Sequence, residues 1–259
     1  MFSFLLESRS FNLFGLTISF YGLMIAIAMI LGVSFAFLIC RVKKYDNNMP
    51  INLALFAIPL AIIGARLYYC AFNGVSSFWQ IFKIWEGGMA IYGGIIGGFI
   101  GVLLCSKIMH YSLLDCLDLA APCLIIGQAV GRIGCYFAGC CYGIETDNEA
   151  LQVFPISVLI GGKWHLATFF YEAVLNLIGF IILMIITKKS DKKGIVVSSY
   201  LIIYGFVRAL LETIRDPSES LMFFSTGIKV SQGLSVLLFI FGIVMLFVIL
   251  NRKPKKERE

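Results

Sequence analysis

Long apolar stretches follow one another along most of the chain, and short polar segments separate them. A helix needs roughly 20 apolar residues to cross about 30 Å of membrane hydrocarbon. Seven stretches come close to or exceed this length, at residues 17–40, 51–72, 89–109, 113–130, 168–186, 194–211 and 232–250. The pattern therefore predicts an all-α integral membrane protein, with a bundle of seven transmembrane helices in one polytopic domain, residues 1–259.

The composition agrees with this class of protein. Hydrophobic residues make up 59% of the 259 residues, charged residues make up 14%, and the mean hydropathy is +0.91. Soluble domains hold about 45–50% apolar and about 25% charged residues. The first apolar stretch is longer than the apolar part of a cleaved signal peptide, and no basic segment precedes it, so we expect it to remain as an anchor.

Lysine and arginine gather in alternate connections between the predicted helices. Residues 41–48, Lys107, residues 187–193 and the tail 251–259 together hold thirteen of the twenty-one. Because these residues concentrate in cytoplasmic loops, we expect the N-terminus outside the cell and 251–259 as a basic cytoplasmic tail. The formal charge of +6 then reflects topology, and no nucleic-acid partner is expected.

One face of the sixth predicted helix and its end carries four polar side chains. Tyr204, Arg208, Glu212 and Arg215 are spaced by four, four and three residues, which places them on the same helical face. One interpretation is a surface ion-pair ladder where the helix leaves the bilayer. The functional interpretation rests on Arg208, which still lies inside the apolar stretch, where a buried guanidinium needs an anionic partner.

In the predicted orientation, most of the polar groups at membrane depth lie towards the outer leaflet. Arginines from separate segments reach this level: Arg66, Arg132, Arg208 and Arg215. The same level is expected for Tyr21, Tyr92 and Glu172. Arginine suits bidentate recognition of phosphate, and the phosphate available at this depth belongs to a phospholipid headgroup. We therefore expect a membrane lipid as a ligand.

Glycines flank several of these polar residues. In YGGIIGGFIG (residues 92–101) they recur at a spacing that permits close helix contact, and plain helix packing is one interpretation. Gly93 and Gly94 would also leave room for a ligand beside Tyr92. The glycines of GRIGCYFAGCCYG (residues 131–143), Gly143 among them, indicate a backbone that turns or approaches another segment closely.

The chain has eight cysteines, and three of them fall together on the expected outer side. The spacing of Cys135, Cys140 and Cys141 matches no zinc pattern, and the two histidines are distant in sequence, so no metal site is predicted. A disulfide from Cys135 to Cys140 or Cys141 is compatible with an oxidising face. A redox relay would use the same residues, and the sequence leaves these alternatives open.

Six motifs, in a constant order, make the chain resemble the prolipoprotein diacylglyceryl transferases of bacterial inner membranes. The signature is GQAVGRIGCYFAGCCYG (127–143), and the others are FYGLMIAIA (20–28), GARLYYCAFN (64–73), GGMAIYGGIIGG (87–98), TFFYEA (168–173) and YGFVRALLETIRDP (204–217). The likeness extends from Tyr21 to Pro217. It implies a seven-helix bundle with a small periplasmic head, which residues 144–167 would supply.

The resemblance implies a reaction as well as a fold. Members of this family move the diacylglyceryl group of phosphatidylglycerol onto the thiol of a lipobox cysteine in a preprolipoprotein, and glycerol 1-phosphate leaves. We therefore expect phosphatidylglycerol and lipobox-containing preprolipoproteins as partners and the bacterial inner membrane as location. No metal and no other cofactor is expected.

The matching positions also imply roles for individual residues. Arg132 and Arg208 would bind the phosphate, Tyr204 and Glu212 would order the site, and Tyr92 stands where the family has a histidine. Substrate contacts are expected from Tyr21, Arg66, Gly93, Gly94, Gly143, Glu172 and Arg215.

Four positions depart from the family pattern. Tyr92 replaces the histidine, Cys135 and Ala138 replace two asparagines, and Cys140 replaces a glutamate. Because a tyrosine with its usual pKa of about 10 is a poor base, the general base is not evident from the sequence. A related lipid transferase with another acceptor, or a non-catalytic lipid-binding or redox membrane protein, remains as an alternative.

Overall fold

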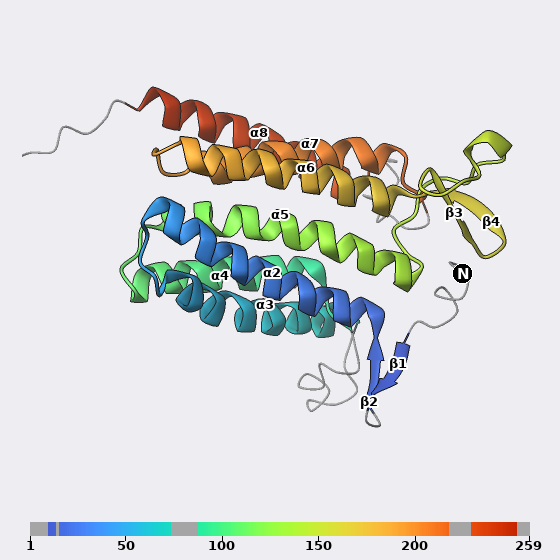
Figure 1. Ribbon diagram of the computed structural model, residues 1–259, viewed down its shortest axis with the longest axis horizontal. Helices are drawn as coiled ribbons and strands as arrows, with labels where there is room; N and C mark the ends of the chain where they lie inside the picture. The colour runs from blue at the N-terminus through green and yellow to red at the C-terminus, as the bar shows by residue number, and fades with distance from the viewer. Residues whose placement is uncertain (1–9, 14–15, 74–87, 218–228, 253–259) are drawn as a thin grey trace, which may run out of the picture. The chain divides into compact units, whose positions relative to one another are not determined.

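The structure is a computed structural model that describes residues 10–13, 16–73, 88–217 and 229–252. Its helices are α2 (Phe20–Lys43), α3 (Met49–Asn73), α4 (Ile91–Ile108), α5 (Leu113–Ala138), α6 (Thr168–Lys189), α7 (Ile195–Thr213) and α8 (Val230–Asn251), and a short 3-10 turn, η3, spans Glu149–Leu151 (Figure 1). Within the described ranges, all seven of these helices are long and apolar enough to cross a membrane, which confirms the predicted all-α membrane fold.

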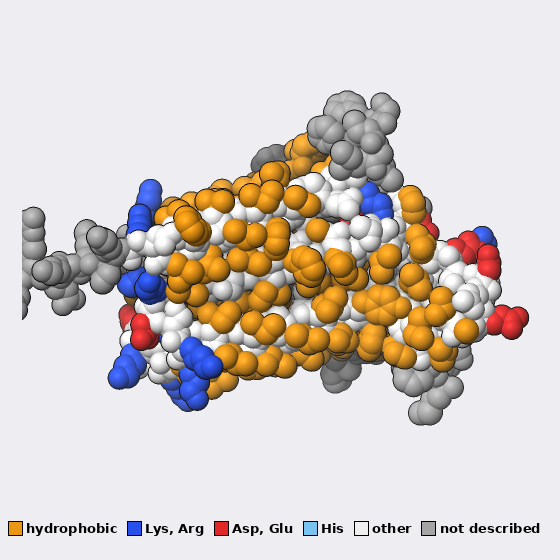
Figure 2. Space-filling view, turned by 90° about the horizontal axis from the view of Figure 1, so that it is seen from above, with side chains coloured by type: hydrophobic (Ala, Val, Ile, Leu, Met, Phe, Trp, Pro, Cys, Tyr) orange, Lys and Arg blue, Asp and Glu red, His pale blue; other side chains and the backbone are white. Residues whose placement is uncertain are grey.

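The chain forms two compact units. One unit comprises residues 1–35 and 121–259, and the other comprises residues 36–120. Helices α2 and α5 each contribute to both units. Hydrophobic side chains cover the length of the helices in Figure 2, while lysine and arginine side chains gather at helix ends. This distribution suits helices whose sides face hydrocarbon.

Helix α5 is longer than its apolar stretch suggests. The predicted span ends at residue 130, whereas the helix continues to Ala138 and so includes Arg132 and Cys135. Packing explains why the glycines in this stretch do not end the helix: a Cβ on Gly134 would lie 3.1 Å from Cδ2 of Tyr21 in α2. Tertiary contact thus overrides the low helix propensity of glycine.

Two short hairpins complete the structure, and neither was predicted. Strands β1 (Ser10–Leu13) and β2 (Leu16–Ser19) pair in antiparallel fashion just before α2, so the first helix starts at Phe20 and not at residue 17. Strands β3 (Ser157–Ile160) and β4 (Lys163–Leu166) form the second hairpin, between α5 and α6. With η3, this hairpin makes up the segment 144–167, for which a small head was expected; its side of the membrane stays a prediction.

In the unit of residues 36–120, α3 and α4 pack through glycines. A Cβ on Gly93 would overlap the carbonyl oxygen of Gly64, and one on Gly101 would lie 2.6 Å from the carbonyl oxygen of Phe56. The close approach of the two backbones therefore requires glycine, as the small-residue spacing indicated. By contrast, a Cβ on Gly94 would make an ordinary contact, 3.6 Å from Cβ of Ala65.

Within each unit, polar connections that follow different helices contact one another at the same end of the helices. In the unit of residues 36–120, the Tyr111 hydroxyl, which follows α4, donates to Oδ2 of Asp46, which follows α2, at 2.8 Å. In the other unit, Nζ of Lys192, between α6 and α7, donates to the carbonyl oxygen of Leu250 near the end of α8, at 3.2 Å. The basic segment 187–193 therefore lies at the same end of that unit as the last turn of α8.

Candidate functional site

The carboxylate of Glu172 joins two arginines from neighbouring helices. Nη2 of Arg132, in α5, lies 2.8 Å from Oε1 of Glu172, in the first turns of α6. Nη1 of Arg208, in α7, donates to Oε2 of the same carboxylate at 2.9 Å. Two guanidinium groups that are 76 residues apart in sequence therefore converge on a single oxyanion.

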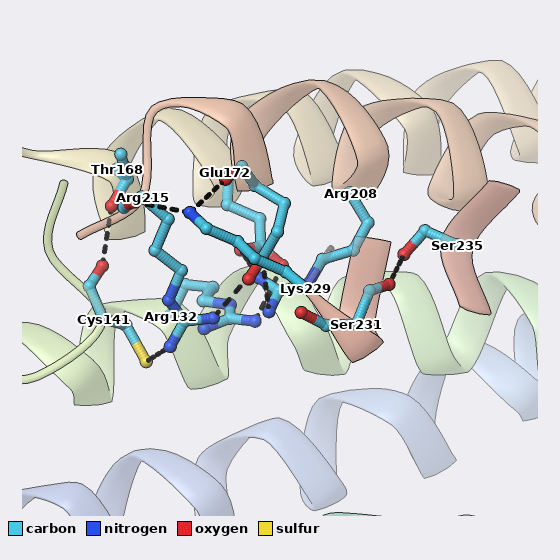
Figure 3. A network of polar contacts seen from close by, with 10 residues as sticks. Arg132, Cys141, Thr168, Glu172, Arg208, Arg215, Lys229, Ser231 and Ser235 are labelled. Atoms are coloured by element: carbon cyan, nitrogen blue, oxygen red, sulfur yellow. Dashed lines mark hydrogen bonds and ion pairs between the residues drawn. The ribbon is translucent and has the colours of Figure 1, made fainter. Parts of the chain in front are cut away.

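A second carboxylate extends this group along α7. Oε2 of Glu212 lies 3.1 Å from Nη2 of Arg208 and 3.7 Å from Nη1 of Arg215. Lys229 adds a further positive charge, because its Nζ donates to the backbone carbonyls of Glu212 and Arg215, at 2.7 Å each. Figure 3 shows the side chains of Arg132, Glu172, Arg215 and Lys229 close together. We call Arg132, Glu172, Arg208, Glu212 and Arg215 the arginine cluster.

The side chains of the arginine cluster are largely shielded from solvent, and the cluster carries an excess of positive charge. The arginine side chains are 12–16% exposed, whereas those of Glu172 and Glu212 are 4% and 0% exposed. Three guanidinium groups face two carboxylates, so one positive charge is left over before Lys229 is considered. Buried charges are stable only when they are paired. The cluster is thus suited to bind one more anion.

Local backbone contacts bring the segment after α5 against β4 and the residues that follow α7. The amide of Gly143 donates to the carbonyl of Leu166 at 2.8 Å, and Gly143 also forms a β-bridge with Arg215. A Cβ on Gly143 would lie 2.7 Å from the carbonyl oxygen of Ile214, so any larger residue would push these segments apart. The predicted close approach at Gly143 is therefore present, and it sets the position of Arg215.

Three thiols lie beside the arginine cluster. The Sγ atoms of Cys135, Cys140 and Cys141 are all within 4.8 Å of one another, and the described residues contain no disulfide. Nη2 of Arg215 donates to Sγ of Cys141 at 3.3 Å. The pKa of Cys141 is lowered from its ordinary value by hydrogen bonds from the Cys135 and Cys140 thiols and by the positive charges of Arg132 and Arg215.

A small pocket lies between Cys141 and the arginine cluster. Its lining comes from α5, α6, α7 and the segment after α5, and consists of Arg132, Cys141, Thr168, Glu172, Arg208, Leu211 and Arg215. Among the described residues, the three cysteines form the one group of three or more potential metal ligands whose ligand atoms lie together. The site therefore places buried guanidinium groups beside clustered sulfur atoms.

Two of the predicted tyrosines lie within the same unit. The Tyr204 ring stacks on that of Tyr200, with 5.7 Å between centroids, one helical turn before Arg208. Tyr21 packs against Gly134, which lies two residues after Arg132 in α5. Both therefore belong to the same unit as the arginine cluster.

The remaining predicted site residues belong to the unit of residues 36–120. Nη1 of Arg66 donates to the carbonyl oxygen of Gly88 at 3.0 Å, and its guanidinium lies 5.8 Å from the centroid of the Tyr69 ring. Tyr92 has its ring centroid 6.3 Å from that of Tyr68. Packing against α3 accounts for Gly93, and ligand contacts of Arg66, Tyr92, Gly93 and Gly94 stay predictions.

Sequence reasoning missed two residues of the site and the ion pairs of a third. Lys229, whose Nζ contacts the backbone at the end of α7, stands just before α8 and had no spacing signal of its own. Thr168 donates its hydroxyl to the carbonyl oxygen of Cys141 at 2.8 Å. The ion pairs of Glu172 were also missed, because Arg208 had been matched with Glu212, its neighbour on the same helical face.

Comparison with known proteins gives consistent matches over nearly the whole chain. The family described as prolipoprotein diacylglyceryl transferase matches residues 9–248. A phosphatidylglycerol–prolipoprotein diacylglyceryl transferase of Clostridium botulinum (strain Langeland) is 36% identical over 253 residues, which are 95% of this chain and 98% of that protein. Proteins of the same name from Streptococcus equi and Listeria monocytogenes are 39% and 33% identical, over 92% of this chain and 93% and 88% of theirs.

Proposed function

This chain belongs to the prolipoprotein diacylglyceryl transferase family, and from that membership we propose its reaction. The protein transfers the diacylglyceryl group of phosphatidylglycerol to the thiol of a lipobox cysteine in a prolipoprotein, and glycerol 1-phosphate is released. The observation that carries the proposal is the convergence of Arg132 and Arg208 on one carboxylate. Their fork geometry suits an oxyanion, and a lipid phosphate is such an anion.

The chemistry requires stabilisation of a departing phosphate. The acceptor sulfur forms a bond to a glyceryl carbon while the bond from that carbon to the phosphate oxygen breaks, and the phosphate keeps the electron pair. Each guanidinium has five N–H donors, and the contacts of Arg132 and Arg208 with Glu172 and Glu212 use only some of them. The others are available to the phosphate oxygens, where preorganised donors lower the barrier most effectively.

Glu172 acts as a positioning residue in this proposal. Its two oxygens hold Arg132 and Arg208 in a fixed relation before any lipid arrives. Glu212 does the same for Arg208 and Arg215. Because the acidic partners are almost fully buried, the guanidinium groups need not reorganise when the headgroup binds. Tyr204 would support Arg208 from one helical turn away.

We further propose that the arginine cluster lies on the outer side of a bacterial cell membrane. The basic segments at 187–193 and after α8 mark the opposite end of the same unit, where Lys192 contacts Leu250. Lysine- and arginine-rich connections face the cytoplasm. The N-terminus is then outside, residues 144–167 form an external head, and the C-terminus is inside. The tail beyond residue 252 lies outside the described residues.

A reconstituted transfer assay tests the function. The purified full chain is incubated with phosphatidylglycerol and a lipobox peptide, and the products are identified by mass spectrometry. We expect a thioether-linked diacylglyceryl peptide and an equal amount of glycerol 1-phosphate. A peptide with serine in place of the cysteine, and phosphatidylethanolamine as donor, serve as controls. No product from the wild-type chain with any lipobox peptide would overturn the proposed reaction.

A further inference from the structure

The three thiols next to the arginine cluster have the geometry of a metal site. Their Sγ atoms are within 4.8 Å of one another. In a tetrahedral zinc–thiolate site with bonds of about 2.3 Å, neighbouring sulfurs are about 3.8 Å apart. Side-chain movements of about 1 Å or less therefore suffice to bring Cys135, Cys140 and Cys141 around one ion.

The local backbone holds the three sulfurs together. The amide of Cys140 donates to the carbonyl oxygen of Cys135 at 3.2 Å, which closes a turn at the end of α5. Cys141 has a φ of 61°, in the left-handed region that non-glycine residues rarely adopt. The hydroxyl of Thr168 binds the carbonyl oxygen of Cys141 at 2.8 Å and so fixes this conformation. Such a conformation persists only where surrounding contacts enforce it.

The surroundings of the thiols suit a metal–thiolate centre. Cys135 is 7% exposed and belongs to an apolar cluster with Val158, Ala167 and Phe169, against which Cys140 and Cys141 pack. Three thiolates around Zn²⁺ carry one net negative charge, and the arginine cluster nearby carries an excess of positive charge. The Arg215 guanidinium, 3.3 Å from Sγ of Cys141, would donate to a metal-bound sulfur. Hydrogen bonds of this kind stabilise and orient metal ligands.

We propose that Cys135, Cys140 and Cys141 bind one zinc ion, and that its fourth position takes the thiol of the acceptor cysteine. The second part rests on the proposed transferase function. Thiolates select zinc among the common divalent ions, and three protein ligands with one open position are typical of catalytic zinc. Because Cys141 lines the pocket with Arg132 and Arg208, an ion bound to its sulfur lies at the edge of the phosphate-binding surface.

The ion would generate the nucleophile, which is the thiolate of the acceptor cysteine. A free thiol has a pKa of about 8.5 and is mostly protonated at neutral pH, whereas a thiol bound to zinc is deprotonated. On binding, the acceptor S–H bond breaks and the proton passes to water. The thiolate sulfur then bonds to the glyceryl carbon, and the phosphate leaves with the electron pair. Zinc is neither oxidised nor reduced, and the neutral thioether is a weaker ligand and dissociates.

This site differs from what the sequence predicted. The spacing between Cys135 and the adjacent Cys140 and Cys141 fits no common zinc motif, and on that ground no metal was expected. The structure brings the sulfurs together across the turn that ends α5, and the fourth ligand comes from outside the chain. A spacing rule for four-ligand sites does not apply to such an arrangement.

Metal content gives the first test. The full-length chain is purified in detergent without a metal-affinity tag, and zinc is measured by inductively coupled plasma mass spectrometry. We expect one zinc per chain in the wild type and a loss of bound zinc in Cys135→Ser, Cys140→Ser and Cys141→Ser. The matched control is Cys123→Ser, in the same helix as Cys135, which should keep its zinc. Equal zinc in all four variants, or none in the wild type, would overturn the site.

Cobalt substitution tests the open position without relying on activity. Zinc is removed from the wild-type chain with a chelator and replaced by Co²⁺, whose thiolate complexes absorb in the near ultraviolet. We expect this absorption band to change when a lipobox peptide is added, and to stay constant with the serine peptide. If the absorption band of the bound cobalt stays unchanged when the cysteine peptide is added, the proposed role of the fourth position is wrong.

The experiments distinguish a failure of the zinc proposal from a failure of the proposed transferase function. If the zinc-free chain transfers lipid at the wild-type rate, the role of zinc in activating the acceptor thiol is wrong while the transferase stands. If zinc binds as expected but no lipidated peptide forms, the site stands and the transferase reaction fails. Thiol counting on the purified chain adds a further check, because a disulfide between two of the three cysteines would leave too few ligands and overturn the proposal.

Discussion

Arg208 shows why arginine is needed at the centre of this site. Its Nη1 and Nη2 contact two different carboxylates, those of Glu172 and Glu212, so both branches of the planar fork are used. A lysine ammonium is a compact charge and cannot make this two-sided contact. The fixed guanidinium plane leaves its remaining donors in a defined direction for a phosphate.

Removing either central arginine should abolish most of the activity. We expect Arg132→Ala and Arg208→Ala each to reduce turnover about 100-fold or more, because one preorganised donor to the developing charge is worth about 3 kcal/mol. Arg208→Lys should also lose activity, since it keeps the charge but not the fork. The measurement is the rate of peptide lipidation. Lys163→Ala is the control, because its surface ion pair with Glu145 lies outside the cluster; unchanged rates in Arg208→Ala would exclude its role.

Glu172 should matter for stability as well as for rate. Its replacement by alanine leaves two nearly buried guanidinium groups without their shared partner, and breaking a buried pair typically costs about 3–5 kcal/mol. We expect Glu172→Ala to lower the thermal midpoint in detergent clearly. Glu172→Gln, which keeps the shape and one acceptor, should lower it less. Equal midpoints for wild type and Glu172→Ala would show that the carboxylate does not hold the arginines.

At the scale of elements, the helices could be predicted and the connections could not. Runs of apolar residues locate all seven helices, because membrane depth sets their length. The extension of α5 to Ala138 depends on packing of Gly134 against Tyr21, and no local pattern shows such a contact. The strands of the β3–β4 hairpin are only four residues long, which is too short for an alternating pattern to be evident.

Gly143 gives a test of how the elements position the site. We expect Gly143→Ala to reduce lipidation about 10- to 100-fold, because a displacement of about 1 Å at a catalytic group can cost that much. The added Cβ would lie 2.7 Å from the carbonyl oxygen of Ile214, next to Arg215. Gly131→Ala, in α5 with nothing within 4 Å of the added Cβ, should keep its activity. Similar activity in both variants would argue against this packing role.

For the whole molecule, charge predicts the orientation, whereas the site depends on long-range contacts. Glu172 and Arg208 are 36 residues apart, so their pairing could not be read from spacing on one helix. The Arg208–Glu212 pair, at four residues, could be. Lys229 precedes α8 and donates to the carbonyl oxygen of Arg215, just after α7. No sequence pattern indicates this contact. The arginines were therefore predictable as residues, but their partners on other helices were not.

Epitope insertion tests the orientation of the chain. We expect an epitope placed between Gly161 and Gly162, at the tip of the β3–β4 hairpin, to be cleaved by protease added to intact spheroplasts. One placed between Asp191 and Lys192 should be protected until the membrane is opened, because basic connections face the cytoplasm. The reverse pattern would invert the proposed topology and place the arginine cluster on the cytoplasmic side.

The central claim is that Arg132 and Arg208 together bind the phosphate of a phospholipid. An experimental structure of the full chain with phosphatidylglycerol tests it most directly. The account predicts phosphate oxygens within about 3 Å of both guanidinium groups, as in charge-assisted hydrogen bonds, with the glyceryl carbon facing the cysteine cluster. A headgroup bound elsewhere, with both arginines still engaged only by Glu172 and Glu212, would contradict it.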